Sequence, residues 1–206
     1  MPRIKLWRHF LETPYLAESE IPTTPIKEKG SFWRFFLDLV ETLFLSVALF
    51  FGINALTARV VVEGFSMRPT LENDSYILVN KMAYRSKLPE RGDIIVFHFP
   101  IDPDQDFIKR VIGLPGDEID IHDGQVIVNN LTLSEAYIAA APQYAGSWHV
   151  PENHVFVLGD NRNNSSDSHA WGAVPLENVI GKAIFTYWPP PTWQMIKHVQ
   201  LGLGTP

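Results

Sequence analysis

The chain contains no cysteine, so neither a disulfide nor a thiolate metal ligand contributes to its structure or chemistry. Positive charge is also scarce, because 17 lysine and arginine residues face 23 aspartate and glutamate residues and the formal net charge is -6. Without a basic stripe to neutralise phosphates, a nucleic-acid partner is not expected. We find no glycine-rich phosphate loop and no zinc-finger spacing, so the sequence predicts neither a cofactor nor a metal.

Apolar residues are plentiful by contrast. Of the 206 residues, 46% are hydrophobic and 19% are charged, which is enough apolar material for a core and argues against a disordered chain. Residues 1–31 differ, because they carry prolines and charges of both signs without a sustained period. We therefore expect a flexible cytoplasmic tail over 1–31, followed by one domain of ordinary size and an appendage.

The longest apolar stretch runs from Leu39 to Ala58 and contains a single charge, Glu41. Twenty helical residues extend about 30 Å, which is the thickness of the hydrocarbon core of a bilayer. Ser31 is suited to cap a helix that begins at the next residue. These features predict a transmembrane helix over residues 32–58.

Two alternatives stay open for this stretch: a buried helix of a soluble protein, and a signal peptide cleaved after small residues such as Ala55 or Ala58. The flanking positive residues favour an N-terminus in the cytoplasm and place the larger C-terminal part on the exported face of a plasma membrane or thylakoid. Those residues are Lys27, Lys29 and Arg34 before the stretch and Arg59 and Arg68 after it.

Beyond residue 58 the hydrophobic period becomes that of β-strands. The predicted strands occupy residues 59–65, 75–82, 93–99, 107–112, 118–121, 125–128, 154–158 and 179–188. The pair Asp123-Gly124 suits a two-residue hairpin turn, and residues 134–151 are predicted to be a surface loop. The expected fold is therefore mainly β, with a mostly antiparallel domain over 59–190 and a C-terminal tail over 191–206.

A serine and a lysine in this β-rich part suggest a catalytic pair. Ser66 lies in a turn-forming stretch, and a serine hydroxyl becomes a good nucleophile when a neighbouring base takes its proton. Lys109 and Arg110 interrupt an apolar strand and point to opposite faces of it. An arginine keeps its proton in proteins, so Lys109 is the candidate base. The alternative is that both residues lie on a solvated edge strand.

A lysine can act as this base only if it is neutral near pH 7, which requires its pKa to fall by roughly three units at a cost of about 4 kcal/mol. Burial among apolar side chains has this effect, and Phe107, Ile108, Val111 and Ile112 surround the lysine in sequence. Because Ser66 follows the apolar stretch by eight residues, it lies within about 30 Å of the predicted membrane surface.

Four segments resemble those of type I signal peptidases in order and spacing, and the similarity covers about residues 38–189. They are SMRPTL (66–71), RGDIIVF (91–97), KRVIGLPGD (109–117) and GDNR (159–162), the last followed by Ser165, Asp167, Ser168 and Trp171-Gly172. The resemblance implies a membrane-anchored serine endopeptidase that removes signal peptides from exported preproteins. It also implies a Ser66 nucleophile, a Lys109 general base and a mostly β scaffold.

The same resemblance implies roles for polar residues around the pair. Ser165 would hydrogen-bond and orient the lysine ammonium. Asp160, Arg162 and Asp167 would support the site through contacts with the residues around the catalytic pair. Many family members carry an arginine where this chain has His169, so a salt bridge from Asp167 would depend on histidine protonation.

The oxyanion and the substrate can also be placed from the sequence. The backbone N–H of Ser66 is the expected oxyanion donor, and some members add a hydroxyl at the position of Gly64. Shallow pockets for small substrate side chains are predicted from Val60, Val62, Met67, Leu71 and Ile108, with ordinary core packing as the alternative.

Two other functions stay open. One is a Ser/Lys protease with a single dedicated substrate, and the other is a non-catalytic, membrane-anchored binding module. The expected partners are preproteins and the lipid bilayer, and the sequence leaves the oligomeric state open.

Overall fold

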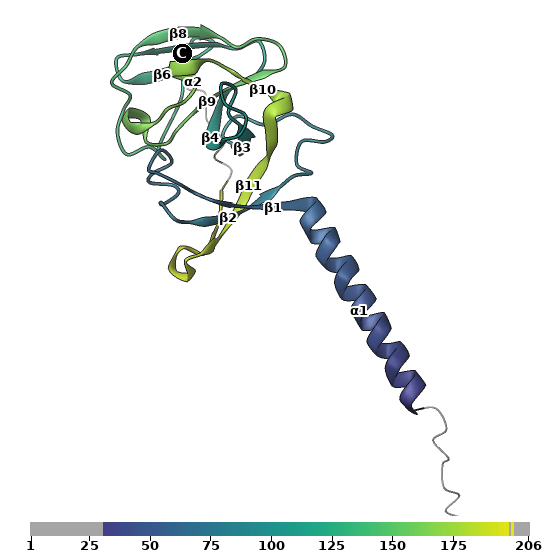
Figure 1. Cartoon of the computed structure of the whole chain (residues 1–206). Coiled ribbons are helices and arrows are strands. Elements are labelled where there is room, and N and C mark those ends of the chain that lie inside the picture. Colours follow the sequence, from purple (N-terminus) through teal and green to yellow (C-terminus); the bar gives the residue numbers. More distant parts are fainter. Residues whose placement is uncertain (1–30, 198, 200–206) are drawn as a thin grey trace, which may run out of the picture. The chain divides into compact units, whose positions relative to one another are not determined.

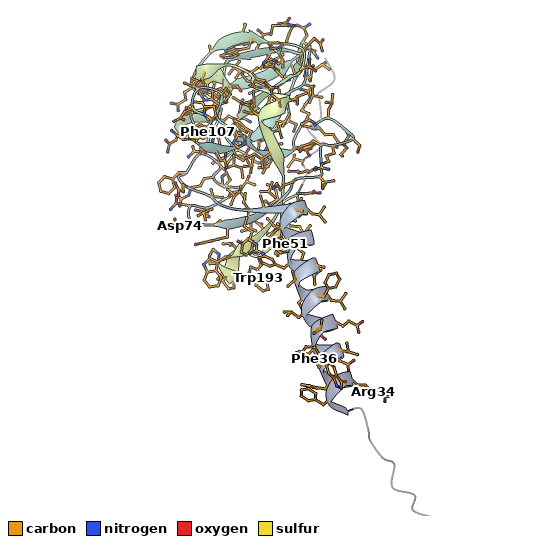
Figure 2. The ribbon with its side chains drawn as sticks, turned by 45° about the vertical axis from the view of Figure 1, so that its right-hand side comes forward. Arg34, Phe36, Phe51, Asp74, Phe107 and Trp193 are labelled. Atoms are coloured by element: carbon orange, nitrogen blue, oxygen red, sulfur yellow. The ribbon has the colours of Figure 1, made fainter. Side chains whose placement is uncertain are left out.

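The apolar stretch forms one continuous helix. The computed structural model describes residues 31–197 and Val199, and helix α1 (Ser31–Leu56) opens this part. Residues Phe32–Leu56 are long and apolar enough to cross a membrane, with a mean hydropathy of 2.0, and none of the apolar window is buried. Phe36 and Phe51 project away from the helix (Figure 2). The helix ends two residues earlier than predicted, because the first strand starts at once.

The rest is mainly antiparallel β, as the alternating pattern predicts. The strands are β1 (Thr57–Val61), β2 (Tyr76–Asn80), β3 (Ile94–His98), β4 (Asp106–Gly113), β5 (Glu118–His122), β6 (Gln125–Val128), β7 (Leu131–Thr132), β8 (Gly146–His149), β9 (His154–Leu158), β10 (Val174–Pro175), β11 (Val179–Trp188) and β12 (Gln194–Met195). Every strand pairing in the described part is antiparallel.

Two sheets make up this part. The larger sheet has the order β1-β2-β11-β3-β4-β9-β10, with β12 also paired to β11, and the smaller has the order β7-β6-β5-β8. Figure 1 shows β6 and β8 of the smaller sheet at one end and β1 and β2 of the larger sheet at the other. Short helical turns, η1 (Arg162–Asn164), α2 (Ser168–Trp171), η2 (Leu176–Asn178) and η3 (Pro190–Thr192), lie between or after the later strands.

The central strand β3 is apolar on both faces because both are covered. Ile94 and Val96 belong to one hydrophobic cluster, and Ile95 and Phe97, which point the other way, belong to a second. A continuous apolar run is the expected pattern for such a strand. Its neighbour β4 is held between β3 and β9, so the residues of β4 are fixed by pairing on both sides.

The hairpin between β5 and β6 turns at the predicted pair. Asp123 and Gly124 have φ angles of 52° and 73°, and His122 pairs with Gln125 across the turn. Two consecutive positive φ angles are characteristic of a type I′ turn, which matches the twist of the strands that it joins.

Two segments predicted to be irregular contain strands. Residues 134–151 are only partly a loop, since β8 pairs with β5 inside them. The C-terminal tail predicted over 191–206 is joined to the larger sheet at its start, because β12 pairs with β11, and its positions 198 and 200–206 lie outside the described residues. Of the predicted N-terminal tail, residues 1–30 also lie outside them. The chain divides into two compact units between Leu45 and Ser46, within α1.

Candidate active site

Ser66 lies in the turn that follows β1, and neighbouring backbone contacts fix its position. The Asn161 backbone N–H donates to the Ser66 carbonyl oxygen at 2.9 Å, and the Asn161 side-chain amide donates to the Phe65 carbonyl at 3.1 Å. The Gly64 N–H donates to the side-chain oxygen of Asn73 at 2.6 Å. Gly64 has a φ of +91°, a conformation that favours glycine, which is why a hydroxyl-bearing residue does not fit easily here.

Lys109 reaches this serine from strand β4. Its Nζ lies 2.9 Å from the Oγ of Ser66 and donates to the Ile108 carbonyl oxygen, also at 2.9 Å. The lysine is only 4% exposed. Because β4 is an interior strand and both basic residues are buried, the alternative of a solvated edge strand is wrong for Lys109 and Arg110.

Burial lowers the pKa of Lys109 from 10.5 to about 8. The negative charges of Asp167 and Asp160 act in the opposite direction and raise it, but less strongly. The ring of Phe107 lies 5.2 Å from the ammonium position on the same face of the strand. The direction of the pKa shift is the one that general-base chemistry needs, because it raises the fraction of neutral amine near neutral pH.

A cleft of about 490 Å³ opens beside this pair and is lined by Ser66 and Lys109 together with residues of β1 and β4. Of the predicted pocket residues, Val60 and Ile108 line it. The other three predicted pocket residues, Val62, Met67 and Leu71, are buried in a hydrophobic cluster and do not line this cleft, so their pocket role stays a prediction. Their apolar side chains support the turn that carries the serine.

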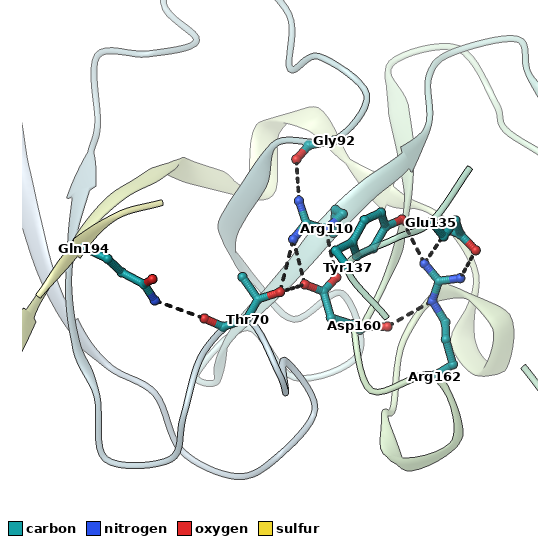
Figure 3. A network of polar contacts seen from close by, with 9 residues as sticks. Thr70, Gly92, Arg110, Glu135, Tyr137, Asp160, Arg162 and Gln194 are labelled. Carbon is teal, nitrogen blue, oxygen red and sulfur yellow. Dashed lines mark hydrogen bonds and ion pairs between the residues drawn. The ribbon is translucent and has the colours of Figure 1, made fainter. Parts of the chain in front are cut away.

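Arg110 points to the other face of β4 and binds Asp160. Its Nε and Nη2 donate to the two carboxylate oxygens of Asp160 at 2.8 and 2.6 Å, and its Nη1 donates to the Gly92 carbonyl at 2.9 Å. The Thr70 hydroxyl also donates to Asp160 (Figure 3). The predicted supporting residue Asp160 therefore joins β4 to the segment that carries Ser66.

Arg162, the second predicted supporting residue, has partners that the sequence did not reveal. Its guanidinium donates to both carboxylate oxygens of Glu135, at 2.5 and 2.6 Å, and to the hydroxyl of Tyr137 at 3.1 Å. Glu135 and Tyr137 come from the region predicted to be a surface loop. Their one sequence signal is an acidic and an aromatic residue two positions apart, which is too common to identify a site.

Asp167 is held by the backbone and by the histidine that replaces an arginine. It accepts from the Gly159 N–H at 2.9 Å, and its other oxygen lies 2.6 Å from the Nδ1 of His169. The ring of Tyr144 stacks on this histidine at 4.0 Å between centroids. The predicted dependence of this contact on histidine protonation stays a prediction, and the geometry for an ion pair is present.

Ser165 departs from its predicted contact. Its hydroxyl is buried and has no hydrogen-bond partner within residues 31–197, so the predicted bond to the lysine is not formed in this structure. The reason is that Lys109 directs its nitrogen to Ser66 and to the Ile108 carbonyl instead. Ser165 packs against Gly159, where an added Cβ would overlap its hydroxyl and come within 2.5 Å of the Ser66 carbonyl oxygen.

Comparison with known proteins defines the class. A family model described as signal peptidase, peptidase S26, matches residues 36–188. A probable signal peptidase I-2 of Synechocystis sp. is 41% identical over 184 residues, which cover 85% of this chain and 84% of that protein. A signal peptidase I of Leptolyngbya laminosa is 44% identical over 160 residues, covering 73% of this chain and 78% of that protein.

A third relative is a plant protein. The thylakoidal processing peptidase 1 of Arabidopsis thaliana is 36% identical over 148 residues, covering 66% of this chain and 44% of that protein. Together these matches define a serine endopeptidase. The chain belongs to the signal peptidase family, peptidase S26.

Proposed function

We propose that the chain cleaves signal peptides from preproteins with Ser66 as the nucleophile and Lys109 as the general base. One observation carries the proposal: the nitrogen of a buried lysine lies 2.9 Å from a serine hydroxyl oxygen, and both residues line one open cleft. Relatives named signal peptidase I support the substrate class.

Acylation begins when neutral Lys109 accepts the hydroxyl proton of Ser66. The serine oxygen attacks the carbonyl carbon of the scissile peptide bond and forms a tetrahedral intermediate. The lysine ammonium then gives its proton to the leaving amine, so an ester between Ser66 and the signal peptide remains. Lys109 is neutral again and ready for the second half of the reaction.

Deacylation repeats the same proton transfers with water. Lys109 removes a proton from a water molecule, whose oxygen attacks the ester carbonyl, and the serine oxygen leaves with the proton that the lysine returns. The Ser66 backbone N–H stabilises the oxyanion in both halves. Gly64 contributes no side-chain donor, so the oxyanion site has one hydroxyl fewer than in some relatives.

Asp160, Arg162, Asp167 and Ser165 support Ser66 and Lys109 without contacting the scissile bond. Asp160 and Arg162 hold the segment whose Asn161 N–H binds the Ser66 carbonyl, and Asp167 moderates the depression of the pKa of Lys109. The free acceptor of the Ser165 hydroxyl receives a hydrogen bond from the ammonium that forms during the reaction. In this way the hydroxyl stabilises the charged lysine while it carries the proton.

The substrate lies extended in the cleft and adds backbone hydrogen bonds of the strand type. Val60 and Ile108 border the cleft and accept small side chains next to the scissile bond. Helix α1 anchors the chain in a lipid bilayer, with the N-terminus in the cytoplasm and the catalytic domain, residues 59–190, on the exported face. The membrane is a plasma membrane or a thylakoid, and the thylakoidal relative supports the second.

The test is cleavage of a signal-bearing preprotein by the full chain purified in detergent, with the new N-terminus identified by mass spectrometry. Ser66→Ala and Lys109→Ala should each lower kcat by about a thousandfold or more, because each removes a reacting group. Ser165→Ala should lower kcat by about tenfold, on the order of one charge-assisted hydrogen bond.

Two exposed positions provide matched controls. Ser86→Ala and Lys81→Ala make the same side-chain changes away from the cleft and should leave kcat unchanged. Cleavage that survives Ser66→Ala or Lys109→Ala would contradict the catalytic pair. Cleavage of one precursor out of a diverse panel would instead favour a protease with a dedicated substrate.

A further inference from the structure

Two arginine side chains are buried on either side of one tyrosine ring. Arg110 and Arg162 are 0% and 1% exposed, and their guanidinium carbons lie 4.2 and 5.8 Å from the centroid of the Tyr137 ring. Buried cations are costly unless each is paired and hydrogen-bonded. Asp160 pairs with Arg110, and Glu135 pairs with Arg162, so the four charges balance around the ring.

Tyr137 and Glu135 are bound to one another as well as to the arginines. The Tyr137 hydroxyl donates to Glu135 at 2.6 Å and accepts from Arg162 at 3.1 Å (Figure 3). The segment that carries them is fixed to the smaller sheet, because Leu133 is buried in a core cluster and its N–H donates to the Val126 carbonyl at 2.8 Å. These two side chains therefore present a rigid surface to the arginines.

The contacts continue from this surface to the nucleophile. The Nε of Arg162 donates to the Gly159 carbonyl at 3.1 Å, and two residues later the Asn161 N–H donates to the Ser66 carbonyl at 2.9 Å. On the other side, Asp160 joins Arg110 to Thr70, four residues beyond Ser66. Residues 159–161, which bind the Ser66 backbone, are thus held by Arg162 at Gly159 and by Arg110 at Asp160. Both arginines contact Tyr137, and Arg162 also contacts Glu135.

We propose that Glu135 and Tyr137 are positioning residues for the nucleophile, which act through Arg162 and Arg110 to hold residues 159–161 against the Ser66 backbone. The inference rests on the proposed function, because it requires Ser66 to be the attacking residue. A loose nucleophile still binds substrate but reaches the attacking geometry less often. Loss of either residue therefore lowers kcat and leaves KM nearly unchanged.

The test measures kcat and KM separately for the full chain in detergent, with a peptide that carries a signal-peptide cleavage site. Tyr137→Leu removes the ring between the guanidinium groups, and Glu135→Gln removes the charge that balances Arg162. Each should lower kcat by about tenfold or more with KM within about twofold. Tyr137→Phe keeps the ring and should retain kcat within about threefold, because the stacking surface remains.

Tyr84→Leu is the matched control. Tyr84 is also a partly buried tyrosine whose hydroxyl donates to a carboxylate, that of Asp93 at 2.9 Å, but it does not line the cleft. This control should lower the melting temperature and leave the kcat of the folded enzyme within about twofold. If Glu135→Gln fails to fold, the comparison of Tyr137→Leu with Tyr137→Phe and Tyr84→Leu decides the question.

Equal kcat for Tyr137→Leu and Tyr84→Leu, or a loss confined to KM, would overturn the positioning role. The Ser66→Ala variant separates this inference from the proposed function. If Ser66→Ala is inactive while Tyr137→Leu keeps full kcat, the positioning role alone is wrong. If Ser66→Ala remains active, the proposed function is wrong and the positioning role is wrong with it.

Discussion

The side-chain nitrogen of Lys109 lies 2.9 Å from the hydroxyl oxygen of Ser66, although 43 residues separate the two along the chain. The contact exists because β4 is an interior strand that directs Lys109 to one face and Arg110 to the other. Each basic residue is then held by a different set of partners. The chemistry of the cleft depends on the face that carries Lys109. The position of the serine backbone depends on the face that carries Arg110.

The pH dependence of cleavage should follow the ionisation of Lys109. Its pKa is lowered to about 8, so the amine is mostly protonated at pH 7 and mostly neutral at pH 9. Only the neutral amine accepts a proton from the serine, so kcat/KM should rise with pH, reach half its maximum near pH 8 and level off above about 9. Measurement of kcat/KM from pH 6 to 9.5 checks this, and a profile that is flat through pH 8 would contradict it.

Lys109→Met should stabilise the fold near neutral pH. The depression of the lysine pKa from 10.5 to about 8 corresponds to about 3 kcal/mol of destabilisation at pH 7. Between pH 8 and 10.5 the unfolded chain binds more protons than the folded one. Stability of the wild-type chain therefore rises with pH through that window, and the penalty is fully present below it.

Thermal unfolding in detergent measures this effect. The hydrogen bonds lost from Ser66 and Ile108 offset part of the gain, so Lys109→Met should melt about 5 °C higher at pH 7. The difference should shrink as pH approaches 10.5. Lys81→Met makes the same change at an exposed position and should give no gain of this kind. A variant at 109 that melts lower than wild type at pH 7 would count against the buried neutral amine.

Gly159→Ala should disturb the nucleophile through direct overlap. The added Cβ would lie 2.5 Å from the Ser66 carbonyl oxygen and would also overlap the Ser165 hydroxyl. The backbone at 66 cannot yield without moving the serine, so we expect kcat to fall by about tenfold or more. Gly113→Ala is also crowded, with contacts of 2.9 Å to three side chains, but lies away from the Ser66 backbone, so it should reduce stability without lowering kcat. Equal kcat for the two variants would refute the prediction.

His169→Arg should move the pH profile to lower pH. The negative charge of Asp167 raises the pKa of Lys109, and His169 lies 2.6 Å from that carboxylate. An arginine at this position keeps its positive charge at every relevant pH. A permanent cation would therefore offset Asp167 and lower the lysine pKa further. His149→Arg makes the same change at an exposed position and should leave the pH profile where it is. A pH profile that moves to higher pH in His169→Arg would contradict the prediction.

Much of the fold was predictable because local patterns specify it. Alternating apolar residues predicted most strands of the larger sheet, and the Asp123-Gly124 pair predicted a turn whose φ angles are both positive. The side-chain alternation of a strand, together with the fact that an arginine keeps its proton, was also enough to select Lys109 over Arg110. These inferences succeed because the period of two and the demands of a tight turn depend on neighbouring residues alone.

The parts that the sequence missed depend on contacts between distant segments. Glu135 joins Arg162 across 27 residues, and no local pattern indicates that a residue in an apparent loop is the partner of a buried arginine. The pocket role of Met67 and Leu71 stays a prediction, because apolar residues near a nucleophile serve a core as readily as a cleft and both lie in a hydrophobic cluster. Nearness in sequence could not decide between the two.

The most direct test of the account is the titration of the Lys109 amine itself. The full chain, labelled with ¹³C at the lysine Cε and purified in detergent, can be followed by NMR from pH 6 to 11, with Lys109→Arg identifying the signal. The account predicts a midpoint near 8, well below that of the exposed lysines. A midpoint near 10.5 would mean that the amine is charged whenever substrate is present, and the proposed base would have no lone pair to take the proton.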